Sequence, residues 1–269
     1  MKRILKFTSI LIGLVYVLTN LTACGTNKEE DNELKVSVTS VPHAEIMEHI
    51  EPTLKEKGIN LELIVADDYD VHNRSLAEKE VDANFFQHIP FLEEQIEDFN
   101  YEIVEFGKIH IEPLAVYSNS FTSLDELPDG ATISIPNDPT NEARALALLD
   151  RQGLIEMKNR SDLKATIVDI KENPKNFTFQ EIDAAMLARS LDDVDAAIIN
   201  TNFALAANLD PIADALAMED SNSPNVNILV IRAGDEERQD LLILRESLMS
   251  ETVREFIEKK YEGAVVPVF

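Results

Sequence analysis

The 269-residue sequence has no tryptophan, one cysteine and five histidines. One thiol cannot form an internal disulfide, and no CxxC pair, HxH pair or histidine-rich loop marks a zinc site. No serine, cysteine or carboxylate stands in an obvious pair with a base, as nucleophilic catalysis requires. We therefore expect no catalytic residue, no metal ligand set and no cofactor.

Basic residues are scarce. Lysine and arginine together number 24 against 50 aspartates and glutamates, which gives a net charge of −26. Such a surface repels nucleic acid and anionic lipid headgroups. The composition therefore predicts no nucleic-acid partner, and we interpret the acidic excess as a means of solubility outside the cell.

A twelve-residue apolar run opens the chain, from Phe7 to Leu18, and about twelve residues are too few to cross a bilayer. A cationic head precedes this run, and the small residues of Leu21-Thr-Ala-Cys24 follow it. This order is typical of a secretory signal. The LTAC segment resembles a bacterial lipobox, so we predict that residues 1–23 are removed and that Cys24 is lipidated.

Lipidation of Cys24 would place the protein on the extracytoplasmic face of the cell membrane, because two or more acyl chains, palmitate among them, give stable anchoring. An ordinary cleaved signal with a chance cysteine is the alternative. The polar residues 24–33 are predicted to form a flexible tether. Removal of residues 1–23 takes away three basic residues and no acid, which leaves 21 basic against 50 acidic residues and a net charge of −29.

From Leu34 onward, short apolar runs alternate with amphipathic stretches. Strands are predicted at 34–38, 61–65, 101–118 with a break near Pro113, 131–136, 178–182, 196–199 and 225–232. Helices are predicted at 43–57, 90–97, 138–153, 186–191, 237–249 and 251–260. This alternation predicts an α/β protein with parallel sheets covered on both faces. Crossings near 112 and 224 divide it into two lobes, residues 34–112 with 224–269, and residues 113–223.

Ligands of open α/β sheets bind beyond the carboxyl ends of the strands. The side chains predicted at those ends are aromatic rings, imidazoles, amides and one arginine: Tyr69, Phe86, His88, His110, Asn137, Arg144, Asn200 and Asn227. This set suits a zwitterion with an apolar tail. Arg144 would clamp a carboxylate with two parallel hydrogen bonds, assisted by the free N–H groups at the start of its helix.

Amide oxygens of Asn200 and Asn227 would accept from an ammonium group, and Tyr69 and Phe86 would wall a soft side chain such as a thioether. Adjacent strand residues face opposite ways, so in the segment DANFFQHIP we assign Phe85 to the core and Phe86 to the pocket. Simpler interpretations remain open. Arg144 would then be a member of a surface ion pair, Tyr69 a loop anchor and the two asparagines turn residues. His49 and His72 are expected on the surface.

Several motifs in order resemble one family. They are VPHAEI, DANFFQHIPFLEE, KIHIEPLAVYS, SLDELPDGATISIPNDPTNEARAL, VDIKENPKN, LDDVDAAIIN and GAVVPVF. They resemble the methionine-binding lipoproteins, MetQ/NlpA, which are substrate-binding components of methionine ABC importers. The resemblance spans about residues 34–269. It implies a type II periplasmic-binding-protein fold with L-methionine or a close derivative in the interlobe cleft, and permease and ATPase subunits as partners.

The same resemblance carries residue assignments. The A-N-x-F-Q-H motif falls on Ala83–His88 and makes Phe86 and His88 pocket residues. The motif arginine is Arg144, which would hold the carboxylate, and the remaining matches are Tyr69, Asn200, Asn227 and, in the H-I-E-P segment, His110. One departure is Asn225, where many relatives carry tyrosine after Ser-Pro.

Two other functions are weighed against this one. A zinc- or manganese-binding lipoprotein of a metal importer would use His43, His88 and His110 with an acid. A hydrolase of small peptides would need a triad or a paired-acid motif, and none is apparent. Within the first interpretation, D-methionine, methionine sulfoxide, cystine-like compounds and methionine dipeptides remain open as ligands.

Overall fold

The computed structural model describes residues 33–220 and 222–269. The predicted signal, the lipidation site Cys24 and all but the last residue of the tether lie outside the described residues. Among the described residues, no helix is both long and apolar enough to span a membrane.

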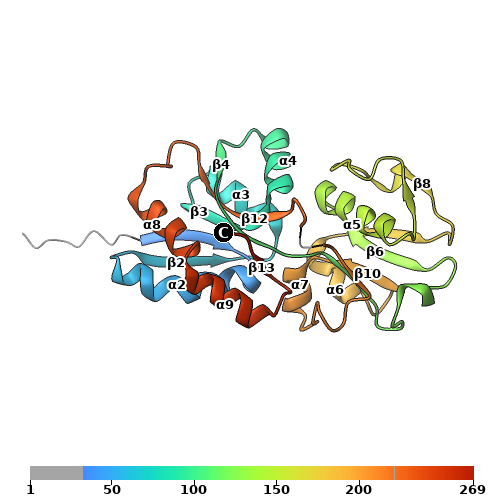
Figure 1. Cartoon of the computed structure of the whole chain (residues 1–269). Coiled ribbons are helices and arrows are strands. Elements are labelled where there is room, and N and C mark those ends of the chain that lie inside the picture. The colour runs from blue at the N-terminus through green and yellow to red at the C-terminus, as the bar shows by residue number, and fades with distance from the viewer. Residues whose placement is uncertain (1–32, 221) are drawn as a thin grey trace, which may run out of the picture. The chain divides into compact units, whose positions relative to one another are not determined.

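The first lobe is built on a six-stranded sheet in the order β13-β4-β12-β3-β1-β2 (Figure 1). Its strands are β1 (Glu33–Val38), β2 (Asn60–Val65), β3 (Ala83–His88), β4 (Ile103–Ile111), β12 (Val226–Arg232) and β13 (Val266–Pro267). Its helices are the short turn η1 (Ser40–Ala44), α2 (Glu45–Glu56), α3 (Tyr69–Ala77), α4 (Ile89–Phe99), α8 (Gln239–Leu248) and α9 (Glu251–Tyr261).

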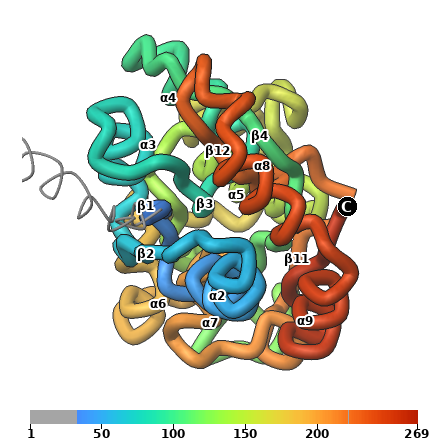
Figure 2. Tube along the Cα trace, turned by 90° about the vertical axis from the view of Figure 1, so that its left-hand side faces the viewer, coloured from blue at the N-terminus to red at the C-terminus, as the bar shows by residue number. Residues whose placement is uncertain are grey.

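Both faces of this sheet are covered, as Figure 2 shows with α2 and α9 on one side and α3 and α4 on the other. Side chains alternate along β12: Leu229 packs in the core beneath α2, α8 and α9, and Ile228 in the core beneath α3 and α4. In β3, Phe85 was expected in the core and Phe86 in the pocket. Phe85 does pack in the core beneath α2, α8 and α9. The two buried faces explain why the strands read as almost continuous apolar runs.

The second lobe contains a five-stranded sheet in the order β11-β5-β10-β6-β9. Its strands are β5 (Ala115–Tyr117), β6 (Thr132–Pro136), β9 (Thr178–Ile182), β10 (Ala196–Ile199) and β11 (Ala217–Met218), beside a separate pair, β7 (Glu156–Met157) and β8 (Ile170–Glu172). Its helices are η2 (Leu124–Glu126), α5 (Pro139–Arg151), η3 (Ile167–Asp169), η4 (Ala184–Met186), α6 (Leu187–Ser190) and α7 (Thr201–Ala206). Helix α5 covers one face of this sheet, and α6 and α7 cover the other.

The prediction of purely parallel sheets is wrong. β12 runs antiparallel to both β3 and β4, and β5 runs antiparallel to β10. β13 is antiparallel to β4 as well. Of these exceptions, β5 and β12 are the strands that carry the chain from one lobe into the other. A strand that enters a lobe at the carboxyl end of its parallel strands has to run in the opposite direction.

Helix α3 is the main element that the periodicity did not predict. Its sequence, YDVHNRSLA, has few apolar residues, but the side chain of Asp68 caps its start by accepting from the Asp70 N–H at 2.9 Å. Such capping stabilises a helix by about 1 kcal/mol. The cap fixes Tyr69 as the first residue of the helix.

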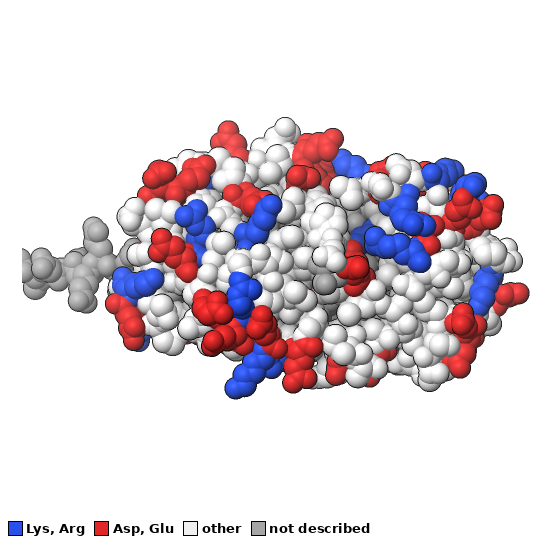
Figure 3. All heavy atoms as spheres, viewed as in Figure 1, with Lys and Arg blue, Asp and Glu red and all other residues white. Residues whose placement is uncertain are grey.

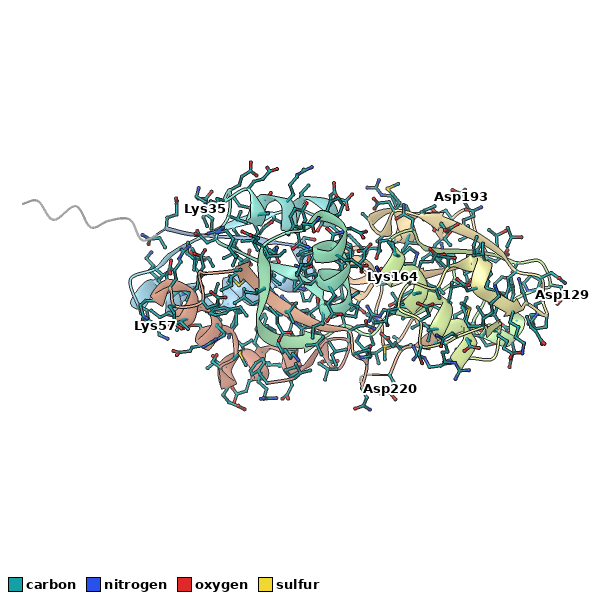
Figure 4. All side chains as sticks on the ribbon, turned by 90° about the horizontal axis from the view of Figure 1, so that it is seen from above. Lys35, Lys57, Asp129, Lys164, Asp193 and Asp220 are labelled. Atoms are coloured by element: carbon teal, nitrogen blue, oxygen red, sulfur yellow. The ribbon has the colours of Figure 1, made fainter. Side chains whose placement is uncertain are left out.

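Charged side chains of both signs are interspersed over the face shown in Figure 3. One exposed ion pair links the two lobes directly. Lys164, labelled in Figure 4, donates to the carboxylate of Glu97 in α4 at 2.6 Å. Exposed pairs of this kind contribute little to stability, so interactions in the cleft carry more of the contact between the lobes.

Candidate ligand-binding site

A cavity lies between the two sheets, at the carboxyl ends of their parallel strands. It contains about 340 Å³ of empty space, part of it open to solvent. Its lining comprises Tyr69, Phe86, Gln87, His88, Phe91, Glu112, Asn141, Arg144, Asn200, Thr201, Asn202 and Asn227. Six of the eight candidate side chains predicted at strand ends are therefore brought together. His110 does not line this cavity, and Asn137 lines a neighbouring hollow instead.

Aromatic rings form one wall of the cavity. The ring centroids of Tyr69, Phe86 and Phe91 lie 5.7 to 5.8 Å from one another. Phe203 of the second lobe approaches Tyr69 at 5.2 Å. Rings at these distances and angles attract one another beyond their buried area, so the wall is preformed and suited to an apolar side chain.

Two hydrogen bonds between side chains of the described residues join the lobes across the cavity. The Tyr69 hydroxyl donates to Asn202 Oδ1 at 2.7 Å. His88 Nδ1 accepts from the Phe91 N–H, so the ring proton is on Nε2, which donates to Asn141 Oδ1 at 3.1 Å. Burial, assisted by the charge of Arg144, lowers the pKa of His88 to about 3, so this imidazole is neutral at physiological pH.

Arg144 projects from α5 and is only 7% exposed, so the interpretation of it as a surface residue is wrong. Its Nε donates to Glu219 Oε2 at 2.8 Å, and its Nη2 donates to the same oxygen and to the carbonyl of Glu112. Nη1 has no hydrogen-bond partner among the described residues. Arg144 lines this cavity and a neighbouring hollow, and the N–H groups of its Nη1 are not engaged by the described residues.

Glu219 is the partner of Arg144 that the sequence reasoning missed. Burial alone would raise its pKa, but the adjacent guanidinium outweighs this effect and leaves the pKa below its ordinary value. Its other oxygen accepts from Ser223 at 2.9 Å and from Asn225 at 3.0 Å. Asn225, the departure from the family pattern, therefore helps to hold this carboxylate and does not line the cavity.

Asn200 presents an unused acceptor. Its Nδ2 donates to Asn141 Oδ1 at 2.9 Å, while its Oδ1 is buried and has no hydrogen-bond partner among the described residues. Buried polar atoms are almost always paired, so an unpaired one calls for an explanation. An N–H donor supplied by a bound molecule would satisfy this oxygen.

His110 lies one layer behind the cavity wall. Its Nε2 is 2.7 Å from Glu112 Oε1, and the same oxygen is 3.3 Å from His43 Nε2. These three side chains come within 4.8 Å of one another. His88, the third histidine of the metal hypothesis, is not part of this group and is engaged with Asn141 instead.

The expected surface position of His72 is also wrong. The side chain is fully buried and stacks on the ring of Phe86 at a centroid distance of 4.2 Å. Its Nδ1 shares a 2.6 Å hydrogen bond with the Ser37 hydroxyl. His72 thus supports the pocket ring by stacking on it.

We predict a pH signature for this residue. Burial lowers the pKa of His72 from 6.5 to about 4, so the unfolded chain binds more protons between these values and stability is lost as pH falls. At pH 5 this effect lowers the unfolding free energy of the wild-type protein by about 2 kcal/mol, and the His72→Phe variant does not have it. The unfolding free energy of His72→Phe relative to wild type should rise by this amount from pH 8 to pH 5. A difference in unfolding free energy between variant and wild type that is the same at pH 8 and pH 5 would contradict this prediction.

Comparisons with known proteins identify the relatives of this fold and site. The family model described as NlpA lipoprotein matches residues 34–269. The chain belongs to the NlpA lipoprotein family. It is 43% identical over 256 residues to the methionine-binding lipoprotein MetQ of Bacillus subtilis, covering 92% of this chain and 93% of the relative. It is 36% identical over 262 residues to the D-methionine-binding lipoprotein MetQ of Escherichia coli K12, covering 96% and 97%.

Solved structures of NlpA relatives share the fold. A nutrient-binding protein from Burkholderia cenocepacia bound to methionine matches with a TM-score of 0.85 at 43% identity, covering 88% of this chain and all of the other. The methionine-binding protein MetQ matches with a TM-score of 0.86 at 37% identity, covering 89% and 99%. The expected two-lobed binding-protein fold is confirmed. The alternative of a metal-importer lipoprotein is not supported, because these relatives are named for methionine.

Proposed function

We propose that this NlpA family member is an extracytoplasmic substrate-binding protein that captures L-methionine or a close derivative for an ABC importer. One observation carries the proposal. Arg144, with an unengaged Nη1, and Asn200, with an unpaired buried oxygen, face the same aromatic-walled cavity. A cation and an acceptor beside apolar rings match the three parts of methionine.

The ligand would lie with its carboxylate on Arg144, as guanidinium forks favour. Its ammonium would donate to the amide oxygens of Asn200 and Asn227. The thioether would lie against Phe86 and Tyr69, where contact between sulfur and an aromatic ring is favourable by roughly 0.3 to 1.5 kcal/mol.

Histidines and acids complete the proposed site without contacting the thioether. His88 would line the pocket as a neutral donor and hold Asn141, while His110 would act from behind through Glu112. This arrangement offers binding and positioning, and we assign no catalytic role to any of these groups.

Transport would couple ligand capture to closure of two lobes, residues 34–112 with 224–269 and residues 113–223. A ligand shifts such an equilibrium only by its differential affinity for the closed state. Arg144 and Asn200 come from the second lobe, and Phe86 and Asn227 from the first, so a ligand that contacts all four favours closure. The closed form would then dock on permease subunits that work with an ATPase.

Membrane attachment is the remaining part of the proposal. Membership of a lipoprotein family and the LTAC segment both support a lipid anchor on Cys24 at the extracytoplasmic face. The anchor is tested by expressing the Cys24→Ala variant, which should leave the membrane fraction while retaining ligand affinity. Retention in the membrane fraction would count against lipidation.

A thermal-shift panel on the full chain in detergent tests the proposed function. L-methionine at a hundredfold excess over its dissociation constant should stabilise the fold by about 2.7 kcal/mol. The panel should include D-methionine, methionine sulfoxide, methionine dipeptides, leucine and zinc. The chain has no tryptophan, so calorimetry is the companion measurement. A shift with zinc and none with any methionine derivative would contradict the proposal.

A further inference from the structure

Glu112 is a buried carboxylate on the cavity wall that the ligand contacts proposed above do not use. It lies directly after β4, where the chain leaves the first lobe, and is only 5% exposed. Glu219 is fully engaged by Arg144, Ser223 and Asn225, and it does not line this cavity. Among the described residues, Glu112 is therefore the only carboxylate in the cavity lining.

Two imidazoles contact this carboxylate. His110 Nε2 and His43 Nε2 both approach Glu112 Oε1, at 2.7 and 3.3 Å. His43 Nδ1 is engaged by the Thr39 hydroxyl at 2.6 Å, and its Nε2 shares a 3.3 Å hydrogen bond with Asn227 Oδ1 while lying 3.3 Å from Glu112 Oε1. A carboxylate hydrogen-bonded to one imidazole and in contact with a second is positioned before any ligand arrives.

These imidazoles do not neutralise Glu112. Burial lowers the pKa of His43 and of His110 to about 3, so both rings are uncharged at physiological pH. Arg144 is already paired with Glu219. Burial raises the pKa of Glu112, so its ionised form has to be stabilised. When Glu112 is ionised, these five groups together carry one negative charge without a counter-charge. A buried charge of this kind is costly unless a cation arrives.

The acceptors around Glu112 also converge. Asn227 Oδ1 lies 3.3 Å from His43 Nε2, the same nitrogen that approaches Glu112 Oε1. Asn227 lines the cavity from β12, and Asn200 brings its unpaired oxygen from the opposite lobe. A primary ammonium, with three N–H donors and a positive charge, is the chemical group that fits a carboxylate and two amide oxygens.

We propose that Glu112 is the counter-charge for the α-ammonium of the ligand and makes the site select zwitterions over anions. This inference rests on the proposed function and deepens it. A ligand that keeps the carboxylate and thioether but lacks the ammonium would bring a second negative charge beside Glu112. Repulsion between the ligand carboxylate and Glu112 would weaken the binding of this ligand. Without Glu112, the amides of Asn200 and Asn227 would distinguish it from L-methionine only through the hydrogen bonds that it cannot make.

Calorimetry with two ligands tests the inference on the full chain in detergent. The ligands are L-methionine and its des-amino analogue, the methylthio-substituted butanoate. Glu112→Gln should weaken L-methionine binding by about 30-fold or more. The same variant should bind the des-amino analogue as well as wild type or more tightly, so the preference for L-methionine collapses. Glu258→Gln, an exposed position on α9, is the matched control and should keep the wild-type preference.

Other outcomes would overturn the inference. Equal weakening of both ligands would make Glu112 a structural residue, and unchanged binding of both would remove it from recognition. Should Glu112→Gln fail to fold, Glu112→Met removes the charge at similar volume and is judged by the same ratio. If wild type binds L-methionine and Glu112→Gln keeps the wild-type ratio of affinities for L-methionine and the des-amino analogue, this inference is overturned and the proposed function stands. Absence of methionine binding by wild type overturns the proposed function and the inference with it.

Discussion

Arg144→Ala should reduce L-methionine affinity by 100-fold or more, corresponding to about 3 kcal/mol. The ligand carboxylate would lose its only cationic partner in a cavity that excludes most water. Arg144→Lys should recover only part of the affinity, because an ammonium lacks the planar fork that binds a carboxylate through two bonds.

The same substitution should also destabilise the ligand-free protein, because it leaves the buried Glu219 with only the partly exposed Arg151, 3.8 Å away, as a cation. Removing one partner of a buried pair typically costs about 3 to 5 kcal/mol. The double variant Arg144→Ala with Glu219→Gln removes both charges. It should regain much of the stability and none of the affinity, which separates a folding defect from a binding defect.

Calorimetry of these variants measures the affinity for L-methionine, and chemical unfolding measures their stability. Glu219→Gln alone serves as the reference for the second substitution. An unchanged dissociation constant in Arg144→Ala would exclude Arg144 from ligand binding. Loss of affinity that the double variant reverses would show that Arg144 acts only by neutralising Glu219.

Asn200→Ala should weaken L-methionine binding by roughly 10- to 150-fold, the range expected for a hydrogen bond to a charged group. The stability of the empty protein should change little. The substitution removes a bond from Nδ2 to Asn141, but it also removes a buried oxygen that has no partner. These two effects oppose each other.

This separation between binding and stability distinguishes a ligand contact from a structural one. Asn60→Ala, at an exposed position in β2, is a matched control that should leave both quantities unchanged. A large loss of stability in Asn200→Ala together with normal affinity would mean that the amide serves the fold and not the ligand.

Local sequence signals predicted much of this fold. A helix was expected from residue 138, and α5 begins at Pro139 with the Asp138 side chain accepting from the Asn141 N–H at 3.0 Å. Strand directions were not predictable in the same way, since the alternation of apolar residues is identical in parallel and antiparallel strands. The reversal of β5 and β12 follows from where the chain crosses between lobes.

The site was predicted in part for a similar reason. Strand ends located the arginine, the amides and part of the aromatic wall, because those positions share one edge of each sheet. Partners defined by tertiary pairing escaped notice. Glu219 lies 75 residues from Arg144 along the chain. Glu112 contacts His110, its neighbour two residues away, and His43, which approaches it only in the folded protein.

The other missed lining residues follow a recognisable pattern. Asn141, Thr201 and Asn202 lie in the first turns of helices that follow predicted strands, and Phe91 lies in the first turn of α4. The first turn of a helix after a strand borders the same edge as the strand end. These positions all lie within four residues of a predicted strand-end residue.

A crystal structure of the chain with L-methionine tests the central claim most directly. We expect the carboxylate on Arg144, the ammonium among Glu112, Asn200 and Asn227, and the thioether against Phe86. Methionine bound elsewhere, or held in this cavity with its carboxylate facing solvent and away from Arg144, would contradict the account.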